Sequence, residues 1–321
     1  MNLLVVGGAG YVGGAVTDLL LDSEHNCRVY DCLLYEEAYR KDVEFVYGDV
    51  RDHELLSRHL AWADAVLWLA ALVGDGACQL NPDVSTSINE KSVEWLTGHY
   101  DGRIVFLSTC SVYGAQNHLI LDEDSPVDPL SVYANTKLGA EKALERKNAV
   151  IFRLGTLFGV GDRFSRLRLD LVVNTLAVRA ARQGRISVFG GDQFRPLLHV
   201  GDAARACLTQ AAGTARGIYN LHRQNVRIID LAYQVRNHFP DLEIEVTPMA
   251  FQDARNYRVT SQKAQQQLGF RPAHSIDEGI EQVKELVESR RLRDLDNPRY
   301  ANLSFLSRFA THCELQEALA S

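Results

Sequence analysis

Two side chains that could move a proton lie four residues apart, at Tyr133 and Lys137. On a helix this spacing puts both on one face, so the Lys137 ammonium would lie beside the Tyr133 phenol. We expect that cation to lower the pKa of the phenol from about 10 toward the working pH, which would make Tyr133 a general base for a hydroxyl group. Because such a pair also arises by chance, its meaning depends on the elements that position it.

Further hydroxyls and a thiol follow the strand expected at Arg103–Leu107, in the run Ser108 to Gly114. Ligands of open parallel sheets bind at the carboxyl ends of strands, where Thr109 could donate to and accept from a reacting hydroxyl. A local turn hydroxyl is the alternative interpretation of Thr109. Cys110, if its pKa were lowered, could exchange a proton at a carbon beside a ketone, although a small buried cysteine is the simpler interpretation.

A glycine motif, Gly7-x-x-Gly10-x-x-Gly13, lies between the first expected strand and the first expected helix. In that context Gly7 allows a tight turn, Gly10 the close approach of a pyrophosphate, and Gly13 the packing of helix on strand. The amino end of the helix supplies amides and a positive dipole to the phosphates. A plain glycine-rich turn is the competing interpretation, so the motif alone is weak evidence for a dinucleotide.

Two aspartates strengthen the dinucleotide interpretation. Asp31 ends the second expected strand, where its carboxylate could accept hydrogen bonds from both ribose hydroxyls and repel a 2′-phosphate, so NAD is favoured over NADP. Asp49 follows the third expected strand and could meet the adenine amino group, or it could serve only as a turn or N-cap residue. An oxidised nicotinamide bound in this way would help Lys137 to lower the pKa of Tyr133.

Short β-branched runs alternate with helical patterns through the first half of the chain. This alternation predicts an α/β fold with right-handed βαβ crossovers, a Rossmann-type doubly wound parallel sheet, and a smaller carboxy-terminal substrate lobe. The expected strands are Leu3–Val6, Cys27–Tyr30, Glu44–Tyr47, Ala65–Leu69, Arg103–Leu107 and Val150–Leu154, and the expected helices are Tyr11–Leu21, His53–Leu60, Val84–His99 and Val132–Arg146.

After Leu154 the pattern becomes irregular, and a long helix is expected at Leu167–Arg182. The predicted NAD-binding domain is residues 1–155, to which residues 196–214 return, and the predicted substrate-binding lobe is residues 156–195 and 215–321. The segment after Arg293 carries no motif that predicts a function. The other elements expected here are strands Ile186–Val188, Ile218–Leu221 and Glu243–Val246 and helices Ala203–Ala212, Gln262–Leu268 and Ile276–Arg291.

The composition is that of a soluble globular protein: of 321 residues, 46% are hydrophobic and 23% are charged, which excludes a disordered chain. The formal charge of −7 argues against a basic face for nucleic acid or for an anionic membrane. Six cysteines without a Cys-x-x-Cys pair predict neither a metal site nor disulfides and favour a cytoplasmic location. The longest apolar run, Ala65–Val73, is shorter than the roughly 20 residues of a membrane span, and the chain does not open with a signal-peptide pattern.

Taken in order along the chain, these motifs resemble those of the extended short-chain dehydrogenase/reductases, specifically the NAD-dependent nucleotide-sugar epimerase/dehydratase family. The resemblance covers roughly residues 2–287 and is specific for fold and cofactor but not for substrate. The motifs that carry it are Gly7 to Gly13, Asp31, Gly48 to Asp52, Leu69 to Ala71, Ser108 to Gly114, Tyr133 with Lys137, and Arg195 to Asp202.

The resemblance implies a tightly held NAD, a nucleotide-diphosphate sugar as substrate, and a homodimer built through the helices Val84–His99 and Val132–Arg146. Tyr133 would be the base, Lys137 would bond to the nicotinamide ribose, and Thr109 would bond to the reacting oxygen. The implied cofactor contacts are Gly7, Gly10, Tyr11, Val12, Gly13, Asp31, Asp49, Val50, Leu69, Ala70, Ala71, Tyr133 and Lys137. The implied substrate contacts are Ser111, Thr156, Ser187, Phe189, Arg195 and Arg255, the last of which could equally form a surface ion pair with Asp253.

Two parts of the sequence depart from the family pattern. Relatives that dehydrate 4-keto sugars carry an Asp-Glu pair directly after the catalytic threonine, where this chain has Cys110 and Ser111. Ordinary 4,6-dehydration and nucleotide-sugar decarboxylation are therefore disfavoured. Many relatives also have asparagine where Thr156 stands, which leaves the identity of the nucleotide open.

The favoured interpretation is an NAD-dependent nucleotide-sugar epimerase that acts at C4 through a transient 4-keto sugar. A nucleotide-4-keto-sugar reductase using NAD(P)H would employ the same Tyr133, Lys137 and Thr109. Further alternatives are a cysteine-assisted 3,5-epimerase or unusual dehydratase, in which Cys110 would act on the sugar, and an NAD-binding sensor without catalysis. Such sensors usually lose the tyrosine or the lysine, and this chain keeps both, which favours an enzyme.

Overall fold

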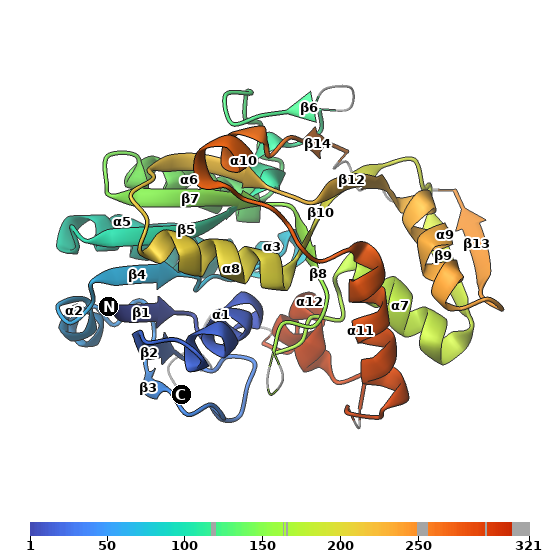
Figure 1. The fold of residues 1–321 in the computed structure, drawn as a ribbon, viewed down its shortest axis with the longest axis horizontal. Helices are drawn as coiled ribbons and strands as arrows, with labels where there is room; N and C mark the ends of the chain where they lie inside the picture. Colours follow the sequence, from blue (N-terminus) through green and yellow to red (C-terminus); the bar gives the residue numbers. More distant parts are fainter. Residues whose placement is uncertain (117–119, 163, 165, 249–255, 293, 310–321) are drawn as a thin grey trace.

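A parallel sheet of seven strands forms the larger lobe of this computed structural model, which describes all residues except 117–119, 163, 165, 249–255, 293 and 310–321. Its strand order is β11-β7-β5-β4-β1-β2-β3 (Figure 1). The order reverses between β1 and β4, the place where open parallel sheets bind ligands. The doubly wound parallel sheet is therefore confirmed. Its strands are β1 (Asn2–Val6), β2 (Asn26–Asp31), β3 (Glu44–Tyr47), β4 (Ala65–Trp68), β5 (Arg103–Thr109), β7 (Ala149–Leu154) and β11 (Gly217–Leu221).

Helices cover both faces of this sheet. The central strands β4 and β5 are buried along their whole length, as strands covered on both sides must be. Helices α1 (Tyr11–Leu21) and α8 (Val200–Ala211) share one apolar cluster with alternate residues of β1. Helices α2 (His53–Leu60) and α6 (Val132–Leu144) share a second cluster with the other residues of β1. The period-two alternation of β1 thus divides its side chains between two cores.

The helix expected at Val84–His99 begins two residues earlier, at Pro82, and contains a π-helical turn. The Asn81 side chain caps a new helix whose first residue is Pro82, a position where the missing proline N–H costs nothing. A π-helical turn then contains Asn89, whose side chain bonds to both backbone groups of Leu72. Its parts are α4 (Pro82–Thr86), the π-helical turn (Ser87–Lys91) and α5 (Ser92–His99), and a separate short helix, α3 (Asp75–Leu80), precedes them.

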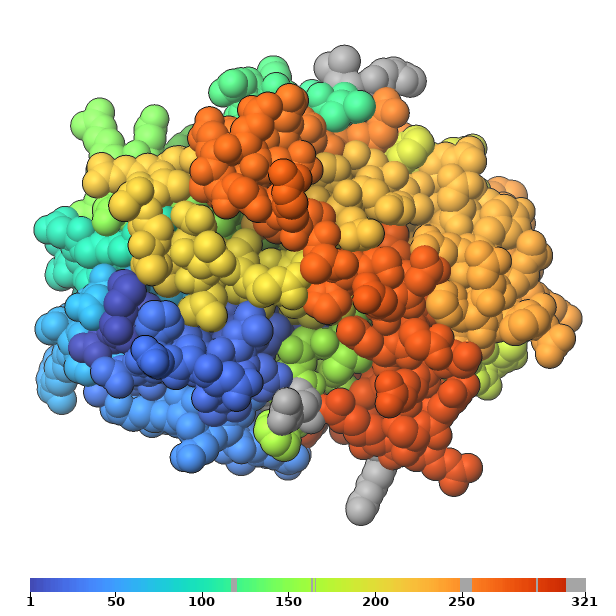
Figure 2. Space-filling view, viewed as in Figure 1, coloured from blue at the N-terminus to red at the C-terminus, as the bar shows by residue number. Residues whose placement is uncertain are grey.

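The smaller lobe is built on a third apolar cluster, in which α7, α9 and α11 pack with β9 and β10. Figure 2 shows its orange residues at one end of the molecule and the blue amino-terminal residues toward the other. A separate pair of short strands joins β6 to β14. The strands are β6 (Ile120–Leu121), β8 (Thr156–Phe158), β9 (Arg185–Phe189), β10 (Phe194–His199), β12 (Gln224–Arg227), β13 (Glu243–Thr247) and β14 (Arg258–Val259), and the helices are α7 (Val172–Gln183), α9 (Ile228–His238) and α11 (Ile276–Glu288).

Two elements of the smaller lobe differ from expectation. The helix expected at Leu167–Arg182 begins at Val172, because the residues before it pair with the carboxy-terminal segment: Leu169 N donates to Tyr300 O at 2.9 Å. Strand β10 was not expected as a strand, yet it pairs with both β8 and β12. Both differences depend on partners that are distant in sequence.

The division between the lobes also differs from expectation, which assigned residues 215–321 to the substrate lobe. Strand β11 is instead the edge strand of the large sheet, parallel to β7. Helix α10 (Gln262–Leu268) packs in the same apolar cluster as α1 and α8. The last described helix, α12 (Asn302–Leu306), packs on α3 and buries Leu306. The expected assignment is therefore wrong for these three elements. Within the described residues, no helix combines the length and the hydrophobicity of a membrane crossing.

Candidate active site

The glycine motif lies in a groove at the carboxyl ends of β1, β2 and β4. Gly7 has a φ of +86°, and a Cβ there would lie 2.4 Å from the amide nitrogen of Ala70. A Cβ at Gly13 would lie 2.3 Å from the Gly7 carbonyl oxygen, so α1 approaches β1 this closely only with glycine at that position. Gly10 is the N-cap of α1 and has no side chain to cover the first amides of the helix. This geometry suits a pyrophosphate at the amino end of α1.

Asp31 lies in the same groove, at the end of β2. Its Oδ2 accepts a hydrogen bond from Ala9 N at 3.0 Å, and its Oδ1 accepts one from Leu33 N at 2.8 Å. Burial raises the pKa of Asp31, and these backbone hydrogen bonds oppose that shift. Because a carboxylate can accept about four hydrogen bonds, ribose hydroxyls can still bind to it. The groove is lined by Gly7, Ala9, Gly10, Tyr30, Asp31, Cys32, Leu33, Leu34, Tyr35, Glu36, Gly48, Asp49, Val50, Leu69, Ala70, Ala71, Leu72 and Ile88.

Asp49 also lines the groove, but its carboxylate is already engaged. Arg51 donates to it from Nε at 2.9 Å and from Nη2 at 2.6 Å, and the Arg51 amide donates at 2.8 Å. The cap of helix α2 is Asp52, not Asp49. Asp49 is thus a turn residue held by Arg51, a partner that the sequence interpretation did not single out. A contact between Asp49 and an adenine stays a prediction.

Helix α6 carries Tyr133 and Lys137 on one face, and its N-cap is Ser131. The ammonium of Lys137 is buried and donates to Leu107 O at 2.9 Å, which ties α6 to the end of β5. Burial lowers the pKa of Lys137 to about 8. Asn89 Nδ2 bonds to Leu72 O at 2.9 Å and to Thr136 Oγ1 at 3.3 Å. Because Leu72 lines the groove and Thr136 lies in α6, Asn89 connects the groove to this helix.

The environment of the Tyr133 hydroxyl differs from the expected one. Burial raises the pKa of Tyr133, and Cys78 and Asp75 raise it further. The Arg168 guanidinium and a hydrogen bond with the Thr109 side chain act in the opposite direction. The expectation that Lys137 brings this pKa toward neutrality is therefore not met by the chain alone, because desolvation of the phenolate outweighs the effect of the Arg168 cation.

The three residues at the end of β5 take different positions. Thr109 caps the short 3₁₀ helix Cys110–Tyr113, with its Oγ1 accepting from Ser111 N at 3.1 Å. Ser111 Oγ lies 3.4 Å from the Tyr257 hydroxyl. Cys110 is fully buried, donates from Sγ to Arg153 O at 3.3 Å, and has its pKa raised by burial. This environment agrees with the simpler interpretation of Cys110 as a small buried cysteine and supplies no lowered pKa for the alternative thiol mechanism.

The expected substrate residues lie on strands of the smaller lobe. Thr156 begins β8, and the buried Arg195 lies on the neighbouring β10, where Nη1 donates to Phe194 O at 2.9 Å. Ser187 and Phe189 are alternate residues of β9, and the Phe189 ring is largely exposed. Arg255 and Asp253 lie outside the described residues. The structure thus brings Thr156 and Arg195 onto one small sheet and places the β9 pair on another.

Two charged residues near Tyr133 were not among the candidate site residues, although the sequence left two interpretations open for the stretch Val73 to Cys78, which contains the first of them: a border of the sugar or an ordinary loop. Asp75 is the first residue of α3, and Arg168 lies in the segment before α7. Both act on the pKa of Tyr133. Asp75 could have been found from its position shortly after β4, at the carboxyl end of the sheet. Arg168 is one arginine among several in an irregular stretch and carries no local signal.

Comparison with known proteins agrees with this geometry. The model of the NAD dependent epimerase/dehydratase family matches residues 3–221. The UDP-glucose 4-epimerase of Corynebacterium glutamicum is 27% identical over 308 residues, which cover 86% of this chain and 92% of that protein. The UDP-glucose 4-epimerase of Halalkalibacterium halodurans is 28% identical over 308 residues, which cover 85% of this chain and 91% of that protein.

Solved structures show the same fold. An NAD-dependent NDP-hexosamine 5,6-dehydratase of tunicamycin biosynthesis is 25% identical with a TM-score of 0.80, and the match covers 91% of this chain and 99% of that chain. The UDP-glucose 4-epimerase of Thermus thermophilus, solved with NAD, is 23% identical with a TM-score of 0.77, and the match covers 89% of this chain and 98% of that chain.

Because the family model covers more than half of the chain, the protein belongs to the NAD dependent epimerase/dehydratase family. It is an epimerase or dehydratase of that family, and its cofactor is NAD. The groove fits this cofactor: the glycines admit a pyrophosphate to the amino end of α1, and Asp31 stands at the end of β2 where ribose hydroxyls would bind.

Proposed function

We propose that the enzyme is a nucleotide-sugar 4-epimerase that works through a transient 4-keto sugar. The observation that carries the proposal is the grouping of Thr109, Tyr133 and Lys137 where β5 meets α6, with no carboxylate in the two positions after Thr109. A 4-epimerase needs a base and a hydride carrier but no further acid for elimination. Relatives named UDP-glucose 4-epimerase support the same assignment.

Tyr133 would take the proton from the sugar 4-hydroxyl and later return it, while Thr109 would hold the reacting oxygen. Gly7, Gly10 and Asp31 of the groove would hold NAD, which would supply reversible hydride transfer at C4, and the positive charge of its oxidised ring would favour the phenolate form of Tyr133. Lys137 would bond to the nicotinamide ribose, because its ammonium is fixed beside β5 by Leu107 O. Reduction of the keto sugar on its opposite face would invert C4.

The nucleotide diphosphate would bind in the smaller lobe. Arg195 is the first candidate for the diphosphate because its planar fork can make two charge-assisted hydrogen bonds. Thr156 lies on the adjacent strand and offers a hydroxyl to the sugar or phosphate. Ser187 and Phe189 would line the base, with the exposed Phe189 ring as a stacking surface. UDP sugars are the first substrates to test, since the named relatives act on UDP-glucose.

We also propose a homodimer in which α5 and α6 of two copies form a four-helix bundle. The two helices pack against each other within one chain. They leave Glu94, Asn135 and Lys142 on an open surface between them. A two-fold axis beside this surface would make the contact isologous. Small-angle scattering should give twice the mass of one chain, and a mass of one chain would contradict the dimer.

Incubation with UDP-glucose, UDP-galactose, their N-acetylhexosamine counterparts and UDP-glucuronate tests the reaction, with products followed by NMR. The 4-epimer should form without net use of NADH. A substrate carrying deuterium at C4 should keep its label in the product, because the hydride returns to the carbon it left. In D2O the product should gain no deuterium on carbon.

Three outcomes would replace the proposal. Stoichiometric consumption of added NADH with a 4-keto sugar would identify a reductase. Deuterium from D2O at carbons beside C4 would indicate a 3,5-epimerase or a dehydratase. The product of a dehydratase would also be 18 mass units lighter than the substrate, because it has lost water. No turnover and no reduced-nicotinamide absorbance with any nucleotide sugar would indicate a binding protein.

A further inference from the structure

The carboxy-terminal segment Asn297–Leu306 crosses back from the smaller lobe to the sheet end of the larger lobe. Its helix α12 packs on α3, and a Cβ at Gly76 would lie 3.2 Å from the Leu303 side chain. The Phe305 ring lies 4.9 Å from the ring of Tyr35, a residue that lines the NAD groove. This segment lies outside residues 3–221, which the family model matches.

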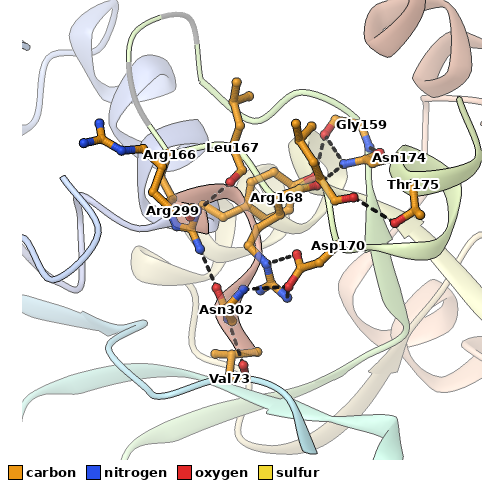
Figure 3. A network of polar contacts seen from close by, with 12 residues as sticks. Val73, Gly159, Arg166, Leu167, Arg168, Asp170, Asn174, Thr175, Arg299 and Asn302 are labelled. Atoms are coloured by element: carbon orange, nitrogen blue, oxygen red, sulfur yellow. Dashed lines mark hydrogen bonds and ion pairs between the residues drawn. The ribbon is translucent and has the colours of Figure 1, made fainter. Parts of the chain in front are cut away.

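Asn302 is the point where this segment meets two others, and it is 4% exposed. Its backbone N donates to Asp170 Oδ2 at 2.9 Å, and its Nδ2 donates to Val73 O at 2.8 Å. Its Oδ1 accepts a hydrogen bond from Arg166. Figure 3 shows Asn302 between Val73 and the segment that carries Arg166 and Asp170. A single side chain therefore joins residues that are far apart in sequence.

Arg168 and Asp170 form a two-pronged ion pair on one side of this junction. Arg168 Nε lies 2.6 Å from Asp170 Oδ1, and its Nη2 lies 3.1 Å from Oδ2. The side chains are 11% and 23% exposed, so the pair is largely shielded from water. Asn174 of α7 donates to Arg168 O at 2.7 Å and fixes the backbone on the other side.

The hydrogen bond from Asn302 to Val73 connects the carboxy-terminal segment toward α6, the helix that carries Tyr133. Val73 lies two residues before Asp75, whose Oδ1 accepts from Ser131 Oγ at 2.6 Å. Ser131 is the N-cap of α6 and accepts from Ala134 N at 3.1 Å, and Tyr133 follows it by two residues. Asn302 is thus linked to the amino end of the helix that carries Tyr133 by its hydrogen bond to Val73, the backbone of residues 73–75, and the hydrogen bonds that Ser131 makes to Asp75 and Ala134.

We propose that Asn302 is a positioning residue for the active site: the carboxy-terminal segment holds the Arg168–Asp170 ion pair and the 73–75 loop against the amino end of α6. The proposal rests on the assignment of Tyr133 as the base. Asn302 does not touch the reacting atoms. It acts by fixing the two charged residues, Asp75 and Arg168, that influence the phenol.

The charges around Tyr133 set the direction of the expected effect. From α3, Asp75 and Cys78 raise the pKa of Tyr133, whereas Arg168 and the Thr109 hydroxyl lower it. Lys137, one turn along α6, is held by Leu107 O. Removing the Arg168 cation therefore raises the pKa of the phenol, and loosening the segment that holds Arg168 does the same to a smaller extent.

The test compares Asn302→Ala with Ser304→Ala, an exposed change on the same short helix, and with Arg168→Gln and Arg168→Lys. For Arg168→Gln the acidic limb of the kcat profile should move up by about one pH unit, a roughly tenfold loss of kcat on that limb. Asn302→Ala should move it in the same direction by less, Arg168→Lys should restore most of it, and Ser304→Ala should leave it unchanged. An unchanged profile in both Asn302→Ala and Arg168→Gln would overturn the proposal.

Hydrogen exchange separates a failure of this inference from a failure of the proposed function, because it requires no turnover. In the NAD-bound full-length protein, Asn302→Ala should increase exchange in residues 73–75 and 131–134 at least several-fold over Ser304→Ala. If exchange there stays at the control level, Asn302 has no positioning role, whatever reaction the enzyme performs. If Asn302→Ala fails to fold, Arg166→Met, which removes a different bond to Asn302, should produce the same local exchange.

Discussion

Two parts of the site are built in different ways: the NAD groove, and the wall near Tyr133 that is formed by Asp75, Arg168 and Asn302. The groove depends on residues close together in sequence: Gly7 directly follows β1, Gly13 lies in α1 and Asp31 ends β2. The wall combines Asp75 of α3, Arg168 of the segment before α7, and Asn302 of α12. A local motif can be recognised in any sequence that carries it. A wall assembled from three distant segments has no such pattern, because its contacts exist only after the lobes have packed.

The largest effect is expected for a substitution at Tyr133, which should lower the rate of the reaction without changing the binding of NAD. Tyr133→Phe removes the proton-transferring oxygen and should lower kcat by about 10²- to 10⁴-fold, the usual contribution of a general base. The NAD groove should be unaffected, because Tyr133 is not among the residues that line it. Steady-state kinetics and NAD titration check both parts. Retained turnover would show that another group is the base.

A second prediction concerns a substitution that should disturb the NAD groove but not the wall near Tyr133. Gly13→Ala puts a Cβ 2.3 Å from Gly7 O, so α1 must shift from β1, which should cost roughly 1–3 kcal/mol in the free energy of unfolding and weaken NAD binding at least tenfold. The matched control is Gly98→Ala in α5, where a Cβ would meet nothing within 4 Å. That change should be neutral or stabilise by about 0.5–1 kcal/mol. Urea unfolding and NAD titration compare the two variants, and equal NAD affinity in both would refute the packing argument.

A third prediction concerns the buried ammonium that joins α6 to β5. The pKa of Lys137 is lowered to about 8 in the folded chain, so between about pH 8 and its unfolded value the unfolded state binds more protons and stability rises with pH. Below pH 8 the folded chain must keep a buried charge. Without NAD, Lys137→Met should therefore be more stable than the parent at pH 7 by about 1–3 kcal/mol.

Urea unfolding of both proteins at pH 7 and pH 9.5 measures this difference. The advantage of Lys137→Met should shrink at the higher pH, where the parent lysine is neutral in the folded state. A constant difference would mean that the hydrogen bond to Leu107 O, not the buried charge, dominates. Activity of the variant should fall in either case, since the proposed contact with the nicotinamide ribose is lost.

The smallest expected effect tests whether Cys110, the residue that directly follows β5, takes part in the reaction. Cys110 is buried and its pKa is raised, so Cys110→Ala should keep kcat within about twofold and lower stability by about 1 kcal/mol through a small cavity. Product analysis and thermal unfolding measure both. A loss of activity beyond 10²-fold with native stability would revive a thiol mechanism.

The sequence by itself determined the parallel sheet, the NAD groove and the position of Tyr133 and Lys137 on one helix face. These features follow from periodicity and from glycine and helix geometry, which act over a few residues. The start of the helix at Pro82 also has local signals, Asn81 and Pro82, that were overlooked. The pKa directions could not be foreseen, because burial depends on what packs around a side chain: it makes Cys110 inert and outweighs the cations near Tyr133.

Only the tertiary structure decided that β11 completes the large sheet, that residues 166–170 form no helix, and that Asn302 joins them to the 73–75 loop. Strand pairing and hydrogen bonds between distant segments replace water only when the whole chain has folded, so no short stretch of sequence encodes them. The reactive groups were therefore visible in the sequence, whereas the charges that surround them were placed by the fold.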